Sequence, residues 1–336
     1  MGGERTVRQQ QCPLVPSSSQ AARVNSENNS TDSVGYPPSW QRLAAPGTPA
    51  HVSQMTDDLL EGVLGRTGMK VHRLGLAASY RPGERAVERA LDSGINFFFC
   101  YGIDGQMIRV LRRLSADRRD RIVIATGAYN YIWWRQDLEK TLEKRLRQLR
   151  TDHIDVFHFL GVMKAKDLSP RVRDQLATLR SDPRVGAVSI SCHDRKLAGQ
   201  LAANGALDCL MIRYNAAHRG AEAEIFPHLT AHNPGVVSYT ATRWTRLLRR
   251  TGGWPKDGPI PTAGQCYRFV LTSPHVDVCL TAPRSERELA ENLEAVRLGP
   301  LPDDELSFLR AYGDAVHRHA GWFMQPSHDS DRGARP

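Results

Sequence analysis

Residues 136–160, QDLEKTLEKRLRQLRTDHIDVFHFL, join an amphipathic segment to a short apolar run and decide the fold class. The leucines at positions 138, 142, 146 and 149 recur at helical spacing. Asp137 lies near the start of that segment, where the helix dipole favours an acidic residue. The run 154–159 has the length and composition of a buried strand. A helix followed by such a strand is typical of an α/β protein with a parallel sheet.

The same alternation recurs along most of the chain. It predicts strands at 71–77, 97–101, 122–126, 154–159, 187–191, 209–214, 236–240 and 276–281. The segments between and after them predict helices at 82–93, 104–117, 136–150, 168–181, 194–204, 219–231, 262–273 and 286–296. Eight strand–helix pairs predict a (β/α)8 TIM barrel. A doubly wound sheet is the structural alternative, but no GxGxxG loop follows the first expected strand.

The chain of 336 residues is 40% apolar and 24% charged, so it can bury a large core. Residues 1–60 are polar and rich in proline without a sustained period, which predicts a disordered tail. We expect the barrel over 61–320 and a flexible tail over 321–336. Met55 opens the stretch that looks folded, so translation could also begin there.

Composition excludes several classes of protein. The six cysteines are scattered, with no CxxC pair and no secretory leader, which favours a reducing compartment. No apolar run approaches the roughly 20 residues of a membrane span, so we expect a cytoplasmic protein without a membrane partner. The net charge is +9, but the arginines fall among acids and leucines at helical spacing, as on solvated helix faces. We expect no nucleic-acid partner, and an anionic small molecule fits the basic excess as well.

In a (β/α)8 barrel the active site lies where the strands end, so the residues there carry the functional argument. Aromatic residues crowd these positions: Tyr101, Tyr129, Tyr131, Trp133, Trp134, Tyr214, Tyr239 and Trp244. Carboxylates and lysines are few, and no His/Asp/Glu spacing resembles a metal site, so we expect no metal. An aromatic mouth suits a small, flat organic substrate, although any one ring could simply cover the barrel end.

Several stretches resemble, in the correct order, the motifs of the aldo-keto reductase family. LGRTGMKVHRLGLAA (64–78) is similar to its N-terminal β-hairpin and first strand, and SGINFFFCYGIDG (93–105) to its second strand. RVGAVSISCH (184–193), GVVSYTATRW (235–244) and APRSERELAENLEAV (282–296) resemble later motifs, so the similarity covers about 62–315. The resemblance implies a barrel of the aldo-keto reductase type, and reduction of carbonyl groups with hydride from NADPH.

The resemblance does not extend to the four catalytic residues of that family. Its aspartate, tyrosine, lysine and histidine align with Phe99, Asp104, Gly127 and Leu160. A tyrosine with an ordinary pKa near 10 protonates an alkoxide poorly without the lysine. The resemblance therefore implies an atypical member with a non-standard active site.

The cofactor contacts that the resemblance implies are retained in part. Tyr239 aligns with the aromatic residue that stacks on the nicotinamide, and Ser191 with a hydroxyl that binds its carboxamide. The two other carboxamide partners align with Cys192 and Met211, which cannot replace them. The remaining implied contacts are Thr240 and Thr242 to the diphosphate, Arg284 and Ser285 to the 2′-phosphate, and Glu291 and Asn292 to the adenine. We expect NADPH to bind, with its adenine end better supported.

Other residues could have taken over the proton chemistry. Asp104 is a candidate acid or base, or a helix N-cap. Tyr101 is a candidate proton donor, or a packing residue. His193 lies at the mouth, and His158 lies deeper, where a core role is the alternative. Arg213 could hold a carboxylate or phosphate, or form a salt bridge outside the barrel.

Three functions follow from these residues. The first is an NADP(H)-dependent oxidoreductase with a non-standard site, acting on a small-molecule substrate. The second is a non-redox cyclase or isomerase on the same barrel, and the third is a silent, cofactor-binding pseudoenzyme. The sequence predicts neither the substrate nor the oligomeric state.

Overall fold

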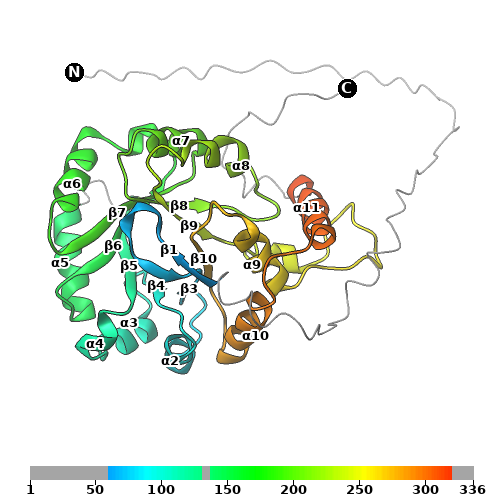
Figure 1. The fold of residues 1–336 in the computed structure, drawn as a ribbon, viewed down its shortest axis with the longest axis horizontal. Coiled ribbons are helices and arrows are strands. Elements are labelled where there is room, and N and C mark those ends of the chain that lie inside the picture. Colours follow the sequence, from blue (N-terminus) through cyan, green and yellow to red (C-terminus); the bar gives the residue numbers. More distant parts are fainter. Residues whose placement is uncertain (1–59, 131–136, 320–336) are drawn as a thin grey trace, which may run out of the picture. The chain divides into compact units, whose positions relative to one another are not determined.

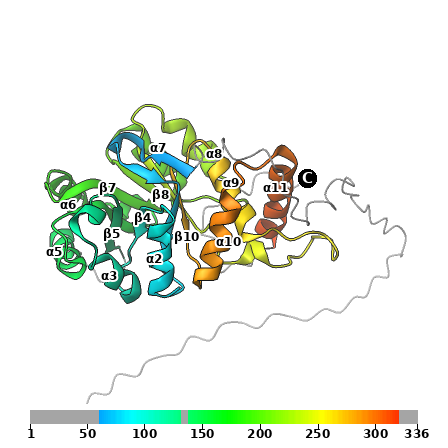
Figure 2. The ribbon, with the colours of Figure 1, turned by 60° about the horizontal axis from the view of Figure 1, so that its bottom comes forward.

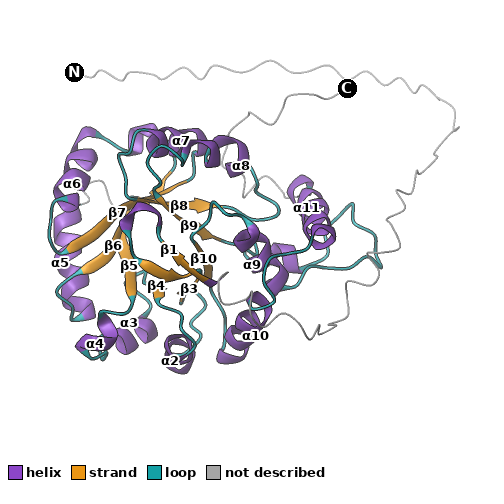
Figure 3. Ribbon diagram, viewed as in Figure 1, coloured by secondary structure: helices purple, strands orange, loops and turns teal. Residues whose placement is uncertain are grey.

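The barrel expected from the sequence pattern is present in the structure. The computed structural model describes residues 60–130 and 137–319. Within them, eight parallel strands close into a barrel in the order β10-β3-β4-β5-β6-β7-β8-β9, surrounded by helices (Figure 1, Figure 3). The (β/α)8 prediction is therefore confirmed. The predicted tails, apart from Leu60, and the residues Tyr131, Trp133 and Trp134 lie outside the described residues.

The strands and helices lie close to their predicted positions. The barrel strands are β3 (Leu74–Ala77), β4 (Phe97–Phe99), β5 (Val123–Tyr129), β6 (Ile154–Val162), β7 (Val185–Cys192), β8 (Cys209–Arg213), β9 (Gly235–Tyr239) and β10 (Val278–Thr281). The α-helices are α2 (Glu84–Asp92), α3 (Gly105–Leu111), α4 (Ala116–Arg119), α5 (Leu138–Leu149), α6 (Pro170–Arg180), α7 (Arg195–Ala203), α8 (Ala221–Glu224), α9 (Ala263–Thr272), α10 (Glu286–Val296) and α11 (Asp303–Arg318). None of the described helices is both long and apolar enough to span a membrane.

Three elements differ from the prediction. The expected helix 104–117 is divided into α3 and α4, and the two other differences have local reasons. The expected strand 71–77 is divided at Arg73, whose guanidinium donates to the carbonyl of Val276 (2.8 Å). The expected helix 219–231 forms only the single turn of α8 before a 3-10 turn takes over. Pro227 lies in that turn, where it lacks the backbone N–H that a continuing helix requires.

The ring of helices closes where the first and last barrel strands meet. Figure 1 and Figure 2 both place α10 beside α2. Arg89 of α2 pairs with Glu286 at the start of α10, with 3.3 Å between nitrogen and oxygen. Both side chains are about half exposed, so this pair adds little stability, and apolar packing holds the two helices together.

A β-hairpin closes the N-terminal end of the barrel, as the family resemblance implied. Strands β1 (Glu61–Val63) and β2 (Lys70–His72) pair antiparallel and lie across that end (Figure 1). Leu64 and Val71 of the hairpin belong to the apolar cluster inside the barrel and are buried. The hairpin therefore fills the bottom of the barrel with side chains.

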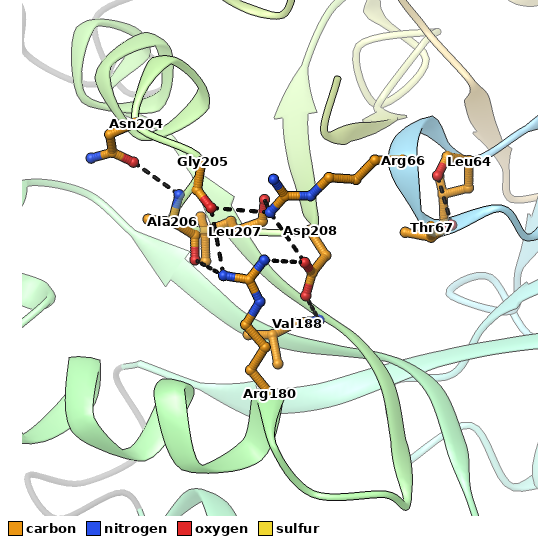
Figure 4. Close-up of polar contacts among 10 residues, drawn as sticks. All are labelled: Leu64, Arg66, Thr67, Arg180, Val188, Asn204, Gly205, Ala206, Leu207 and Asp208. Atoms are coloured by element: carbon orange, nitrogen blue, oxygen red, sulfur yellow. Dashed lines mark hydrogen bonds and ion pairs between the residues drawn. The ribbon is translucent and has the colours of Figure 1, made fainter. Parts of the chain in front are cut away.

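Polar contacts fix this hairpin to the strands above it. Arg66 donates to the carbonyl of Leu207 (2.7 Å) and to the carboxylate of Asp208 (3.2 Å) (Figure 4). Asp208 also pairs with Arg180 of α6 (2.7 Å), and its second oxygen accepts from the backbone N–H of Val188 (3.0 Å). One carboxylate thus connects the hairpin, a barrel helix and β7.

Alternate residues of the strands fill the barrel interior, as period-two geometry requires. The interior apolar cluster includes Phe97, Phe99, Val123, Ala125, Val156, Leu160, Ala187, Met211, Val237, Val278 and Leu280. Two polar residues interrupt it, His158 of β6 and Ser189 of β7, which are Cα partners and fully buried. Within the described part of the chain, the two ring nitrogens of His158 and the hydroxyl of Ser189 have no hydrogen-bond partner.

The buried imidazole predicts a specific pH dependence of stability. Burial lowers the pKa of His158 from 6.5 to about 3, so between these values only the unfolded chain takes up this proton. The free energy of unfolding therefore decreases on acidification. His158 accounts for about 2 kcal/mol of the decrease between pH 7 and pH 5. We predict that His158→Met, which cannot titrate, loses about 2 kcal/mol less than the parent protein over this range. Urea unfolding at both pH values measures this, and equal losses would contradict it.

Candidate active site

The structure brings His193, Arg213 and Tyr239 together at the C-terminal end of the barrel, which we call the mouth. Arg213 and Tyr239 are Cα partners at the ends of β8 and β9, and His193 follows β7. The Tyr239 hydroxyl lies 3.2 Å from Nε2 of His193, and an Arg213 nitrogen lies 3.2 Å from its Nδ1. Ser191 hydrogen-bonds to Tyr239. We name Ser191, His193, Arg213 and Tyr239 the mouth cluster.

The protonation states in this cluster follow from burial and from one fixed charge. Burial, and then the charge of Arg213, lower the pKa of His193 to about 4. Burial raises the pKa of Tyr239 to about 12, against the effect of Arg213 and of the Ser191 hydrogen bond. At neutral pH the imidazole is neutral and the phenol protonated. Because a guanidinium only donates, Nδ1 of His193 accepts from Arg213 and Nε2 carries the proton.

Arg213 lies inside the barrel mouth and not in a salt bridge outside it, which was the alternative from sequence. Met211, two residues earlier on the same strand, belongs to the interior cluster, so alternation turns Arg213 inward as well. Its guanidinium carbon lies 5.6 Å from the ring centroid of Trp244, a cation–π distance. Among the described residues, Arg213 has no carboxylate partner.

An aromatic wall lies on the opposite side of the mouth. Tyr101 follows β4, which is four strands from β8 in the closed barrel and so faces it. The Tyr101 ring stacks parallel to that of Tyr129 at 6.2 Å and meets the Phe99 ring edge-on at 4.7 Å. The mouth is therefore polar on one side and aromatic on the other.

The structure places Asp104 in the turn that carries Tyr101. Its carboxylate accepts from the backbone N–H groups of Gly102 (2.9 Å) and Tyr101 (3.3 Å) and from the Cys100 thiol (3.4 Å). Burial raises its pKa. Asp104 immediately precedes α3, but its side chain makes no capping bond to that helix. In this arrangement Asp104 holds the loop that positions Tyr101.

Gly127, which aligns with the family's lysine, lies against the next strand. Gly127 and His158 are Cα partners, and a Cβ on the glycine would overlap the carbonyl oxygen of His158. The buried guanidinium of Arg145, from α5, donates to the Gly127 carbonyl (3.2 Å). Sequence reasoning missed Arg145 by assigning its charged run to solvent. Its spacing from Leu138 and Leu142 places it on the buried face of the helix.

The Gly127 contact predicts a substitution that the fold does not tolerate. We predict that Gly127→Ala lowers the free energy of unfolding by about 1–3 kcal/mol, because β5 or β6 must shift to admit a methyl group. Thermal and urea unfolding measure the loss. Gly105→Ala is the matched control, since its added Cβ would meet only the flexible end of Arg109. Equal stability of the two variants would contradict the prediction.

The residues expected at the 2′-phosphate lie together at the start of α10. Ser285 is the N-cap, and its hydroxyl accepts from the backbone N–H of Glu288 (3.2 Å). Arg284 donates from Nε to Glu288 (2.9 Å), and its side chain is 70% exposed. A helix N-terminus beside an exposed arginine is favourable for an anion.

The two residues expected at the adenine lie further along α10, and each has a different partner. Glu291 is exposed and pairs with Arg287 (2.8 Å). Asn292 is buried and donates to the hydroxyl of Thr281 on β10 (3.1 Å). Glu291 is thus available to solvent, whereas Asn292 joins the helix to the barrel.

The loop after β9 carries the remaining expected cofactor contacts in a strained backbone. Thr240, Arg243, Trp244 and Thr245 all have positive φ, between 49° and 66°, which costs free energy for residues other than glycine. The carbonyl of Thr240 accepts from Asn215 (2.8 Å), while its buried hydroxyl has no partner among residues 60–130 and 137–319. Buried Arg243 donates to the Val316 carbonyl at the end of α11 (2.8 Å). The Thr242 hydroxyl accepts from the backbone N–H of Thr245 (3.3 Å).

A second hollow, of about 430 Å³, lies outside the barrel wall. Tyr214, Phe226 and Phe269 line it, together with Glu222 and Arg310. Glu222 accepts from the Tyr214 hydroxyl and from Arg310, both at 2.8 Å, so these polar groups satisfy one another. The mouth, with its incompletely paired polar groups, is the better candidate for chemistry.

Known proteins resemble this chain in sequence and fold. YrpG, an uncharacterized oxidoreductase of Bacillus subtilis (strain 168), is 30% identical over 122 residues, and the match spans 28% of this chain and 37% of that protein. The holo form of an aldo-keto reductase from Bacillus halodurans is 19% identical, with 80% of this chain and 99% of that chain covered at a TM-score of 0.62. An aldo/keto reductase from Klebsiella pneumoniae in complex with NADP and acetate is also 19% identical, with 75% and 95% covered at a TM-score of 0.61. At these identities the solved structures show the fold alone.

The family is shown by the sequence profile. The profile described as "Aldo/keto reductase family" matches residues 69–313. This range begins in the hairpin and ends within α11, so it includes all eight barrel strands. The chain therefore belongs to the aldo/keto reductase family of oxidoreductases.

Proposed function

We propose that this protein is an NADP(H)-dependent oxidoreductase that acts on a small organic substrate at the barrel mouth with a non-standard active site. The observation that carries the proposal is the pairing of two sites on one barrel, the mouth cluster and the start of α10 with Arg284 and Ser285. The family match over 69–313 supports it, as does the NADP in the Klebsiella pneumoniae relative.

The residues present fit this cofactor, which would supply the hydride. Thr240 offers a buried hydroxyl without a partner in the loop expected at the diphosphate. Arg284 precedes the N-cap of α10 and is largely exposed, so its ion pair with Glu288 is worth only about 0–1 kcal/mol. A 2′-phosphate, which carries more charge than a carboxylate, could displace Glu288 at little cost.

We assign the proton chemistry to residues on both sides of the mouth. His193 is neutral at neutral pH and carries its proton on Nε2, so it can donate a hydrogen bond to an oxygen that develops negative charge. Tyr101 faces it from the aromatic wall and is the candidate proton donor. Asp104 acts as a positioning residue through the backbone N–H of Tyr101.

Free thiols support a location in a reducing compartment, for which we propose the cytoplasm. Among the described residues, Cys100, Cys192, Cys209, Cys266 and Cys279 are free and buried. Burial raises the pKa of each thiol, so these cysteines remain protonated and unreactive near neutral pH.

Substitution of Arg284 tests the cofactor assignment. We predict that Arg284→Ala weakens NADPH binding about tenfold or more, the usual effect of losing one charge-assisted hydrogen bond to phosphate, and leaves NADH binding unchanged. Titration followed by the fluorescence of the nicotinamide measures both affinities. Arg287→Ala, an exposed arginine on the same helix, is the matched control and should change neither. Equal losses for NADPH and NADH would remove Arg284 from the 2′-phosphate.

Turnover tests the redox assignment. We predict that the protein consumes NADPH with at least one member of a panel of aldehydes, quinones and imines, and that His193→Gln lowers kcat by about 10²-fold. The absorbance of NADPH measures the rate. A folded protein that binds NADPH but does not oxidise it with any compound of the panel would favour the cofactor-binding pseudoenzyme. A folded protein that does not bind NADPH would favour the cyclase or isomerase.

A further inference from the structure

We propose that the substrate carries a carboxylate, and that this group binds the guanidinium of Arg213 beside His193 in the mouth. The proposal rests on the proposed function for the identity of the mouth as the substrate site. It adds the chemical class of the substrate and a residue that selects it.

The position of Arg213 is the first argument. The side chain comes from the inner face of β8, and its contacts are with His193, Tyr239 and Trp244 at the mouth. It therefore presents a charge where the substrate of a barrel enzyme binds. The Trp244 ring lies against one face of the guanidinium. The N–H donors point outward in the plane of the guanidinium and can bind a ligand there.

The missing counter-charge is the second argument. Nε of Arg213 is buried, and the described residues offer it no hydrogen-bond partner and the side chain no carboxylate. A partly buried charge without a partner is unfavourable and is normally compensated by an opposite charge. Residues 131–136, YIWWRQ, which are not described, contain no carboxylate either. Among residues 60–130 and 137–319, no carboxylate pairs with Arg213, whereas a bound carboxylate would supply a counter-ion.

Neighbouring arginines add to the positive charge around Arg213, which favours binding of an anion. Burial and then the charges of Arg213 and Arg246 lower the pKa of Arg243. Burial and then Arg213 and Arg243 lower the pKa of His218. No acidic group is among the causes of either shift, or of that of His193. The electrostatic field on this side of the mouth is therefore positive.

The observations favour a substrate carboxylate over a cofactor phosphate as the anion. The phosphate contacts expected from the sequence lie elsewhere, at the start of α10 and in the loop after β9. Arg213 instead contacts Nδ1 of His193, the ring nitrogen that does not carry the proton. A planar carboxylate matches the fork of an arginine through two parallel hydrogen bonds. The aromatic wall of Tyr101 and Tyr129 lies across the mouth, so we infer that the carboxylate is borne by an aromatic ring.

Binding of benzoate and benzamide tests the proposal, because the two are isosteric and differ in charge. Calorimetry on the full chain, with and without NADPH, should give benzoate an affinity at least tenfold higher than benzamide. Arg213→Gln should abolish this preference, Arg213→Lys should restore part of it, and Arg118→Gln, an exposed arginine of α4, should retain it. Equal affinities in the parent protein, or an unchanged preference in Arg213→Gln, would overturn the proposal.

Two further measurements separate the remaining outcomes. If Arg213→Gln weakens NADPH and inorganic pyrophosphate as much as benzoate, the anion belongs to the cofactor and the proposal fails. If benzoate is preferred in an Arg213-dependent way but NADPH does not bind, the carboxylate site stands and the proposed function fails. Nuclear magnetic resonance of His193 confirms that Arg213→Gln remains folded. The pKa of this imidazole should rise once the neighbouring cation is gone, but remain below 6.5, because burial is the larger cause of its lowering.

Discussion

The pairing of β10 with β3 closes the barrel, and every other feature of the molecule depends on that closure. Cys279 lies opposite Leu74 and Thr281 opposite Leu76, so the first and last strands share one register. Closure gives the sheet a single interior, and period-two alternation then decides which side chains enter it. A slip of one residue in β8 would exchange Arg213 for its neighbour and remove the charge from the mouth.

The interior grades from apolar to polar along the barrel axis. Hydrophobic layers occupy most of its length, with His158 and Ser189 as buried polar groups, and the mouth cluster lies above them. In this environment burial keeps His158 and His193 neutral. The guanidinium of Arg213 lies in the same cluster and donates to His193.

Sequence periodicity was sufficient to predict the barrel, its order of elements and, through the family motifs, the hairpin. It did not predict α11, because the segment Asp303–Arg318 follows the eighth strand–helix pair and is not part of the repeating pattern. Arg145 was missed because a charged residue was assumed to face solvent, although it shares the leucine face of α5. Sequence placed Ser191, His193 and Tyr239 at the mouth, but their mutual contacts depend on rotamers and on neighbouring strands. Contacts of that kind follow from three-dimensional packing and not from local pattern.

The hairpin at the bottom of the barrel has a consequence for kinetics. Leu64 and Val71 fill that end, so a ligand in the interior can enter and leave only by the mouth. Two ligands that meet there share one route, and the one that lies deeper must arrive first and depart last. Arg66 and Asp208, which hold the hairpin in place, thereby bear on the order in which ligands bind, although they lie at the opposite end of the barrel.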